Sequence, residues 1–319
     1  MIRLIRLLAP ILAALPLVLY APPSAFAEAD GSLSTDDAVE AILEASDLPT
    51  NAAPNETSDG ATFIGELATV EVPSDPADGV VITTAGGDEV GLGLPGASQA
   101  DDGSVAENGT VLYEDALPST AVAMQVLDNG AVRALVVVDG ADAPTEFRFP
   151  VSVPDGGGIA LNPDGSADVW NEIGLTVAVV EIPWATDAAG AAVPTHFRLE
   201  GTSLIQVVEH RANGTVYPVV ADPALQFDCG YVTCTLRFNR QWTRNVRDGS
   251  WLAAAFLGIC TAATAGVGAL VCAVVAARMV LDAVLAGRYY ENGNCIKYKI
   301  SFPASATPQE LKRGTYNCA

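Results

Sequence analysis

The fold class of this chain is decided by the stretch Val122-Ala-Met-Gln-Val-Leu127, Asp128-Asn129-Gly130 and Ala131-Val-Arg-Ala-Leu-Val-Val-Val138. Two apolar runs of strand length flank an Asn-Gly pair. Asn-Gly tolerates the positive φ angles of a tight hairpin turn, so the stretch predicts two antiparallel strands.

Similar short runs, each bounded by Gly, Pro, Asp or Asn, recur on both sides of this hairpin about every ten residues. They are 62–72, 79–83, 90–94, 146–149, 159–161, 167–170, 175–182, 196–199, 204–209 and 215–220. This spacing is typical of antiparallel β structure. We therefore predict an acidic β-rich domain over residues 61–225, built as a sandwich or barrel-like sheet.

The chain before this domain contains two different segments. Arg3 and Arg6 precede the apolar run 7–20, and Ala25-Phe26-Ala27 follows it, which is the pattern of a secretion signal over residues 1–27 with cleavage after Ala27. Residues 28–60 are expected to hold one acidic helix, with Val39, Ile42 and Leu43 as its apolar stripe, and then a linker. The protein is expected to be secreted or held at the cell surface.

Charge divides the chain near residue 225. Residues 28–225 contain 33 acidic and 4 basic side chains, whereas residues 226–319 contain 5 acidic and 10 basic ones. The strongly acidic first part should repel nucleic acid. We therefore do not expect the protein to bind nucleic acid. The opposite signs allow the tail to associate with the acidic part.

The six cysteines all lie in the basic tail. They are Cys229, Cys234, Cys260, Cys272, Cys295 and Cys318. An even number in an exported chain indicates disulfides, and the spacing does not suit a zinc site. We predict three disulfides in a small α+β domain over residues 226–319.

Local signals outline this tail. A strand is expected over 230–238, then a short helix capped by Asn239 and closed by Gly249, with Arg240, Arg244 and Arg247 on one flank. A strand over 295–302 can pair with 314–318, which would make Cys295–Cys318 a natural bridge, and Cys260–Cys272 and Cys229–Cys234 would remain.

Residues 252–277 carry no charge and allow three interpretations. Their length suits a transmembrane helix, but this would place Cys295 and Cys318 in the reducing cytoplasm. A helical hairpin, with arms over 251–264 and 269–286 and a turn at Gly266 and Gly268, accounts better for the glycines and the cysteines. The third interpretation makes the same hairpin membrane-active, with Arg240, Arg244, Arg247 and Trp251 as possible membrane or partner contacts.

Catalytic motifs are sparse. Gly91-Leu-Gly-Leu-Pro-Gly96 matches the dinucleotide fingerprint in letters only, because Pro95 stands where the phosphate-binding helix should begin. His196 and His210 are the only histidines, and Glu209 next to His210 should point to the opposite face of a strand. We assign no catalytic, cofactor-binding or metal-ligating residue.

Four segments give the chain a family resemblance. Residues 142–149 (DAPTEFRF), 182–185 (IPWA), 192–195 (AVPT) and 216–223 (VYPVVADP) resemble a β-rich region of exported, largely uncharacterised proteins of high-GC Gram-positive bacteria. The resemblance covers roughly residues 60–223. It implies a variable C-terminal module after Pro223 and brings no catalytic residues.

These observations favour a non-enzymatic secreted or cell-surface protein whose acidic β domain carries a disulfide-stapled module. The first alternative is a bacteriocin-like membrane-active effector that acts through an apolar hairpin over residues 251–287. The second is an extracellular hydrolase, which would need a pocket that joins His196 or His210 to a nucleophile. A membrane surface or a cell-envelope component is the partner that the composition allows.

Overall fold

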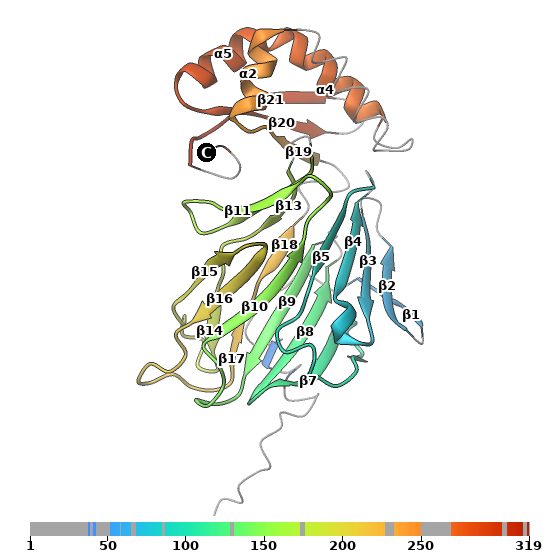
Figure 1. The fold of residues 1–319 in the computed structure, drawn as a ribbon, viewed down its shortest axis with the longest axis vertical. Coiled ribbons are helices and arrows are strands. Elements are labelled where there is room, and N and C mark those ends of the chain that lie inside the picture. The colour runs from blue at the N-terminus through green and yellow to red at the C-terminus, as the bar shows by residue number, and fades with distance from the viewer. Residues whose placement is uncertain are drawn as a thin grey trace, which may run out of the picture. The chain divides into compact units, whose positions relative to one another are not determined.

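The computed structural model describes residues 38, 41–42, 52–57, 59–64, 68–84, 87–127, 131–172, 176–226, 233–249, 269–301, 305–314 and 318 (Figure 1). All of them belong to one compact unit, Ser32–Ala319. These residues do not include the expected secretion signal or the first arm of the apolar hairpin. They also leave out Trp251, Cys229 and Cys260.

Residues 52–226 form two antiparallel sheets. The first sheet has eight strands in the order β1-β2-β3-β4-β5-β10-β16-β15. Their bounds are β1 Asn55–Thr57, β2 Gly60–Ile64, β3 Ala68–Pro73, β4 Val80–Thr84, β5 Glu89–Leu92, β10 Glu146–Ser152, β16 Ser203–Val208 and β15 Thr195–Glu200. A 3-10 turn, Pro76–Asp78, precedes β4. Strand β10 joins sequence-distant halves of this sheet because it pairs with both β5 and β16.

The second sheet has ten strands, eight of them in the order β11-β12-β13-β18-β9-β8-β7-β6, while β14 pairs with β17 and β17 with β9. Their bounds are β6 Ser104–Val105, β7 Val111–Leu117, β8 Thr120–Val126, β9 Val132–Val138, β11 Gly158–Leu161, β12 Ala167–Trp170, β13 Thr176–Val180, β14 Ala185–Asp187, β17 Val219–Ala221 and β18 Ala224–Gln226.

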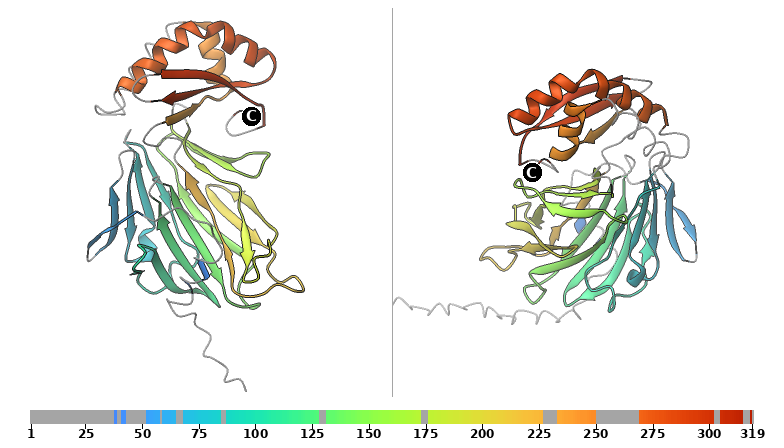
Figure 2. Two further views of the ribbon diagram at one scale, coloured as in Figure 1. Left: turned by 180° about the vertical axis from the view of Figure 1, so that it is seen from behind. Right: turned by 45° about the horizontal axis from the view of Figure 1, so that its top comes forward.

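The two sheets pack face to face around one apolar core, as the views in Figure 2 show. Every residue of β8 is buried, because both faces of that strand are covered. Val122 and Met124 point into the core between the sheets. Ala121 and Ala123 point to the other side, where they pack with Ala38 and Ile42 of the N-terminal helical segment.

The predicted β-rich fold is confirmed, and so is its central hairpin, since Val126 of β8 pairs with Val132 of β9. Three local predictions need correction. Residues 62–72 form two strands, β2 and β3, and not one. The expected linker contributes β1, whose backbone pairs with the open edge of β2. The last expected strand begins only at Val219, because Pro218 has no N–H to donate to a sheet.

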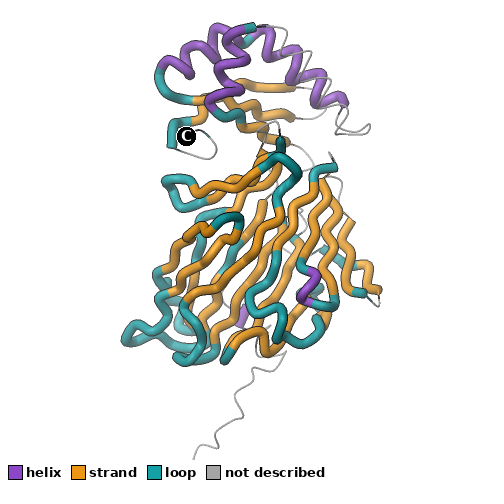
Figure 3. Tube along the Cα trace, in the orientation of Figure 1, coloured by secondary structure: helices purple, strands orange, loops and turns teal. Residues whose placement is uncertain are grey.

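The C-terminal part combines a three-stranded sheet with helices, as the colours of Figure 3 show. The sheet order is β19-β20-β21, with β19 Thr233–Arg237, β20 Cys295–Ser301 and β21 Ser305–Leu311. The helices are α2 Arg240–Asp248, α4 Ala269–Leu281 and α5 Ala283–Glu291. Phe238, Trp242, Val275, Met279, Ile296 and Tyr298 form most of its separate core.

Two local predictions for this part are confirmed. The Asn239 side chain caps α2 by accepting a 2.8 Å hydrogen bond from the Trp242 N–H, and the helix ends at Gly249. Cys295 and Cys318 form a disulfide with an S–S distance of 2.07 Å. Cys272 is also disulfide-bonded, and the pairing expected for the other three cysteines lies outside the described residues.

Other predictions for the tail are wrong. The partners of β20 are β19 and β21, and not residues 314–318. The helix expected over 269–286 breaks at Asp282, whose φ of −97° and ψ of 11° leave the helical path, and α5 then runs past Gly287. Helix α2 packs beside this position, since a Cβ on Gly287 would lie 3.4 Å from the Arg247 Cγ, an ordinary contact distance. No helix among the described residues has the length and apolarity to cross a membrane.

Candidate functional site

The arginines predicted as contact residues mostly serve the C-terminal part itself. The Arg240 guanidinium donates hydrogen bonds of 2.9 Å to the backbone oxygens of Tyr290 and Asn294, and it lies 4.0 Å from the centre of the Tyr290 ring. The Arg247 guanidinium lies 4.7 Å from the same ring and pairs with Asp248. Arg244 remains more than half exposed and lies 3.6 Å from Asp248.

The two histidines differ in their surroundings. His196 is exposed on β15. His210 is buried, and its ring nitrogens contact the Tyr217 hydroxyl at 3.0 Å and the Pro144 carbonyl oxygen at 2.9 Å. Burial lowers the pKa of His210, because the low-dielectric surroundings disfavour the charged imidazolium.

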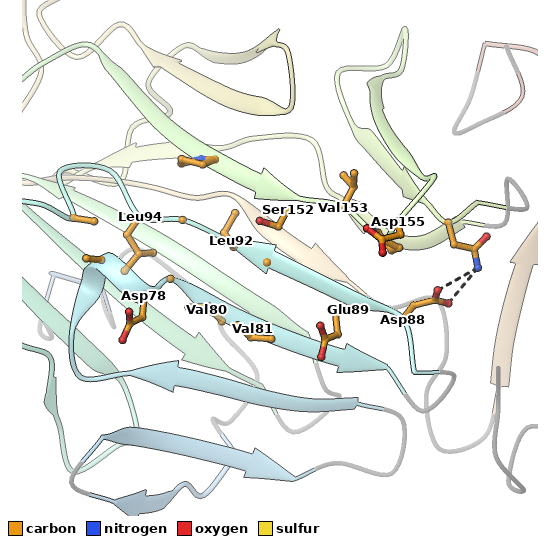
Figure 4. Close-up of a pocket in the computed structure, with 18 of the residues that line it drawn as sticks. Asp78, Val80, Val81, Asp88, Glu89, Leu92, Leu94, Ser152, Val153 and Asp155 are labelled. Atoms are coloured by element: carbon orange, nitrogen blue, oxygen red, sulfur yellow. Dashed lines mark hydrogen bonds between the residues drawn. The ribbon is translucent and has the colours of Figure 1, made fainter.

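A groove of about 780 Å³ is the strongest candidate for a binding site in the described part of the chain (Figure 4). It runs over the outer face of β4, β5 and β10, on the side away from the core between the sheets. The turn before β4, the segment 153–155 and residues 171–172 complete its walls.

Strand alternation and two glycines shape the face that carries this groove. Val90 and Leu92 of β5 point into the core, so Glu89 and Gly91 point outward. A Cβ on Gly91 would lie 3.0 Å from the Cβ of Ser152. One on Gly93 would lie 3.0 to 3.2 Å from the ring carbons of Pro150. Ser152 and Pro150 therefore approach these two positions so closely that a residue larger than glycine would have to displace them.

The lining is strongly acidic. Its described residues include five carboxylates, Asp78, Asp88, Glu89, Asp155 and Glu172, and no Lys, Arg or His among them. Figure 4 shows Asp78 at one end of the groove, Glu89 between, and Asp88 and Asp155 at the other end. The negative charge is therefore spread along the groove and not gathered at one point.

One of these carboxylates is partly withdrawn from water. The Asn171 amide donates hydrogen bonds of 3.2 and 3.5 Å to the Asp88 carboxylate oxygens, and Asn171 itself is buried. Burial raises the pKa of Asp88, the Asn171 hydrogen bond lowers it, and the charge of Glu172 raises it again. A bound cation would stabilise the charged form of this group.

Two glycines of this groove belong to the segment 91–96, which resembles a dinucleotide fingerprint in letters only. However, Gly91 lies within β5, and no helix follows the segment. The acidic lining would also repel a pyrophosphate. The only local signal in the sequence was the pair of outward-facing glycines, Gly91 and Gly93, at the end of a strand-like run, because glycine in a strand marks a close approach of neighbouring segments.

Comparison with protein-family models, with curated proteins and with solved structures gives no match for this chain.

Proposed function

We propose that this chain is an exported, non-enzymatic binding protein whose β domain holds a cationic ligand in the groove over β4, β5 and β10 and carries a disulfide-stapled C-terminal module. The observation that carries the proposal is the row of five carboxylates without a basic neighbour among the described residues of the lining. A disulfide between Cys295 and Cys318 is compatible with an extracellular location.

The shape of the groove narrows the class of ligand. The carboxylates are distributed along its length. A compact ion would reach only one of them. An extended chain with several amino or guanidinium groups, such as a lysine-rich peptide, would reach several of them, and Coulomb attraction would favour it.

Binding of a tetralysine peptide to the mature protein, measured by isothermal titration calorimetry, tests the groove. The double variant Glu89→Gln/Glu172→Gln should weaken binding about tenfold or more, because two carboxylates of the lining lose their charge. Raising the salt concentration should also weaken the binding of tetralysine to the wild type.

The matched control is Glu107→Gln/Glu209→Gln, which removes the same charge from exposed positions outside the lining. It should change the affinity at most about twofold, since distant exposed charges are screened. Equal weakening by both double variants would show that tetralysine responds only to net charge, and the groove proposal would be rejected.

Export is tested separately by the intact mass of protein recovered from culture medium. We expect a chain that begins at Glu28 and takes up six alkyl groups only after reduction, because cleavage follows Ala27 and all six cysteines are paired. A chain retained in the cells with its first 27 residues, or one with thiols that react before reduction, would contradict this part of the proposal.

A further inference from the structure

A second surface lies on the helices of the C-terminal part. Six large apolar side chains are exposed among the described residues. Three of them, Ile64, Ile182 and Val216, are scattered over the β domain. The other three, Val280, Leu281 and Val284, lie within five residues of one another and are 49%, 71% and 78% exposed. Single exposed apolar residues are ordinary, whereas a contiguous group indicates an interaction surface.

These three residues belong to a longer stripe. Ala273, Ala277 and Leu281 follow one another at helical spacing along α4, and Val284 lies in the first turn of α5 after the break at Asp282; all four are exposed. The opposite side of the helices is already occupied, since Val275, Met279 and Ala286 pack in the core with the sheet. The stripe is therefore not the core face of the helices. We call residues 273, 277, 280, 281 and 284 the apolar stripe.

Positive charge borders the apolar stripe. Arg288 is exposed one turn after Val284 on the same side of α5. Helix α2 packs against α5 and brings Arg244 and Arg247 to the same region, where Arg247 contacts Gly287. The acidic groups nearby are Glu291, Asp248, which pairs with those two arginines, and the buried Asp282, which pairs with Arg278.

We propose that the apolar stripe and its arginine border dock on an anionic lipid surface. A short aliphatic face with basic residues at its border is the composition of a helix that lies in a membrane interface. The basic excess of residues 226–319, in a chain whose net charge is −22, directs this part toward anionic headgroups.

This inference does not depend on the groove. It also differs from the membrane-active hairpin over residues 251–287, because only the exposed sides of α4 and α5 take part and the C-terminal core stays packed. The apolar side chains would enter the lipid interface while the opposite faces of the helices stay packed.

Co-sedimentation of the mature, disulfide-bonded protein with lipid vesicles tests the proposal. The wild type should bind vesicles of phosphatidylcholine mixed with phosphatidylglycerol and bind pure phosphatidylcholine vesicles weakly. Leu281→Ser/Val284→Ser should lower the partition coefficient about tenfold or more, because two exposed apolar side chains no longer enter the interface. Arg288→Gln should lower binding to the anionic vesicles alone.

The matched control is Ile182→Ser/Val216→Ser, which makes the same kind of change at exposed positions in the β domain and should leave vesicle binding unchanged. All four positions are exposed, so circular dichroism should show unchanged folds. Absence of wild-type binding to both vesicle types, or equal binding by Leu281→Ser/Val284→Ser, would overturn the proposal. So would self-association of the wild type that this double variant abolishes without any vesicle binding, because the stripe would then be a protein interface.

Discussion

Replacing Phe149 by alanine is expected to destabilise the β domain by about 4 kcal/mol, the usual cost of removing a large aromatic side chain from a packed core. Phe149 is fully buried on β10, in the core between the two sheets. Strand β10 connects β5 with β16, so a cavity at this position loosens contacts between halves of the sheet that are distant in sequence. The measurement is urea unfolding followed by far-ultraviolet circular dichroism, read as a lower midpoint at an unchanged slope.

The neighbouring residue provides the control. Arg148 points to the opposite side of β10, where its side chain is 52% exposed and pairs with Glu200. Arg148→Ala should cost at most about 1 kcal/mol, because exposed ion pairs contribute little. A Phe149→Ala variant as stable as Arg148→Ala would show that β10 does not hold the core in the way the structure indicates.

The second large effect concerns pH. Asp168 on β12 and Asp222 after β17 are both about 99% buried, with exposures of 1% each. Burial raises the pKa of Asp168 to about 7, although the positive charge of Arg237 opposes the rise. Burial likewise raises the pKa of Asp222 to about 7, although the Trp184 N–H donates a 3.0 Å hydrogen bond to its carboxylate and Arg133 lies near.

A carboxyl group whose pKa is raised in the folded state binds its proton more tightly there than in the unfolded chain. Between the ordinary carboxyl pKa of about 4 and the folded value of about 7, stability must therefore fall as pH rises. Each aspartate contributes a loss on the order of 3 kcal/mol across this window. We expect the free energy of unfolding to be larger at pH 5 than at pH 8.

Repulsion among the other carboxylates of this acidic chain acts in the same direction, so variants must separate the two causes. Asp168→Asn/Asp222→Asn should raise stability at pH 8 and flatten the dependence between pH 5 and pH 8, because neutral amides do not titrate. Exchange of two exposed acids, Glu107→Gln/Glu209→Gln, removes as much charge and should leave the slope nearly unchanged. An unchanged slope in the aspartate double variant would exclude these two groups as its source.

Sequence signals were most informative where neighbouring residues make the structure. The Asn-Gly turn predicted β8 and β9 because hairpin partners lie next to each other in the chain. Asn239 and Gly249 predicted both ends of α2 because capping is local chemistry. They were less informative for β14 and β18, which were not predicted: these three-residue strands depend on partners distant in the chain, β14 on β17 and β18 on β9. Strand β7 was also not predicted, although its partner β8 follows it directly.

The candidate site shows the same division. The acidic composition was evident, but no local motif tells which five of 38 acidic residues line one groove. Likewise, the apolar run in the tail indicated helices, and only the packed core distinguishes Val275, which is buried, from Leu281 and Val284, which are exposed.

By itself, the sequence determined a β-rich acidic domain, a basic cysteine-containing tail and the Cys295–Cys318 pairing as its natural bridge, because hydrophobic alternation, turn chemistry and charge are written residue by residue. The tertiary structure alone decided that β10 lies between β5 and β16, that a groove lined by five carboxylates runs over β5 and β10, and that helices α4 and α5 leave an apolar stripe outside the core. These features depend on which distant segments pack together, and the free energy of that packing belongs to no single stretch of sequence.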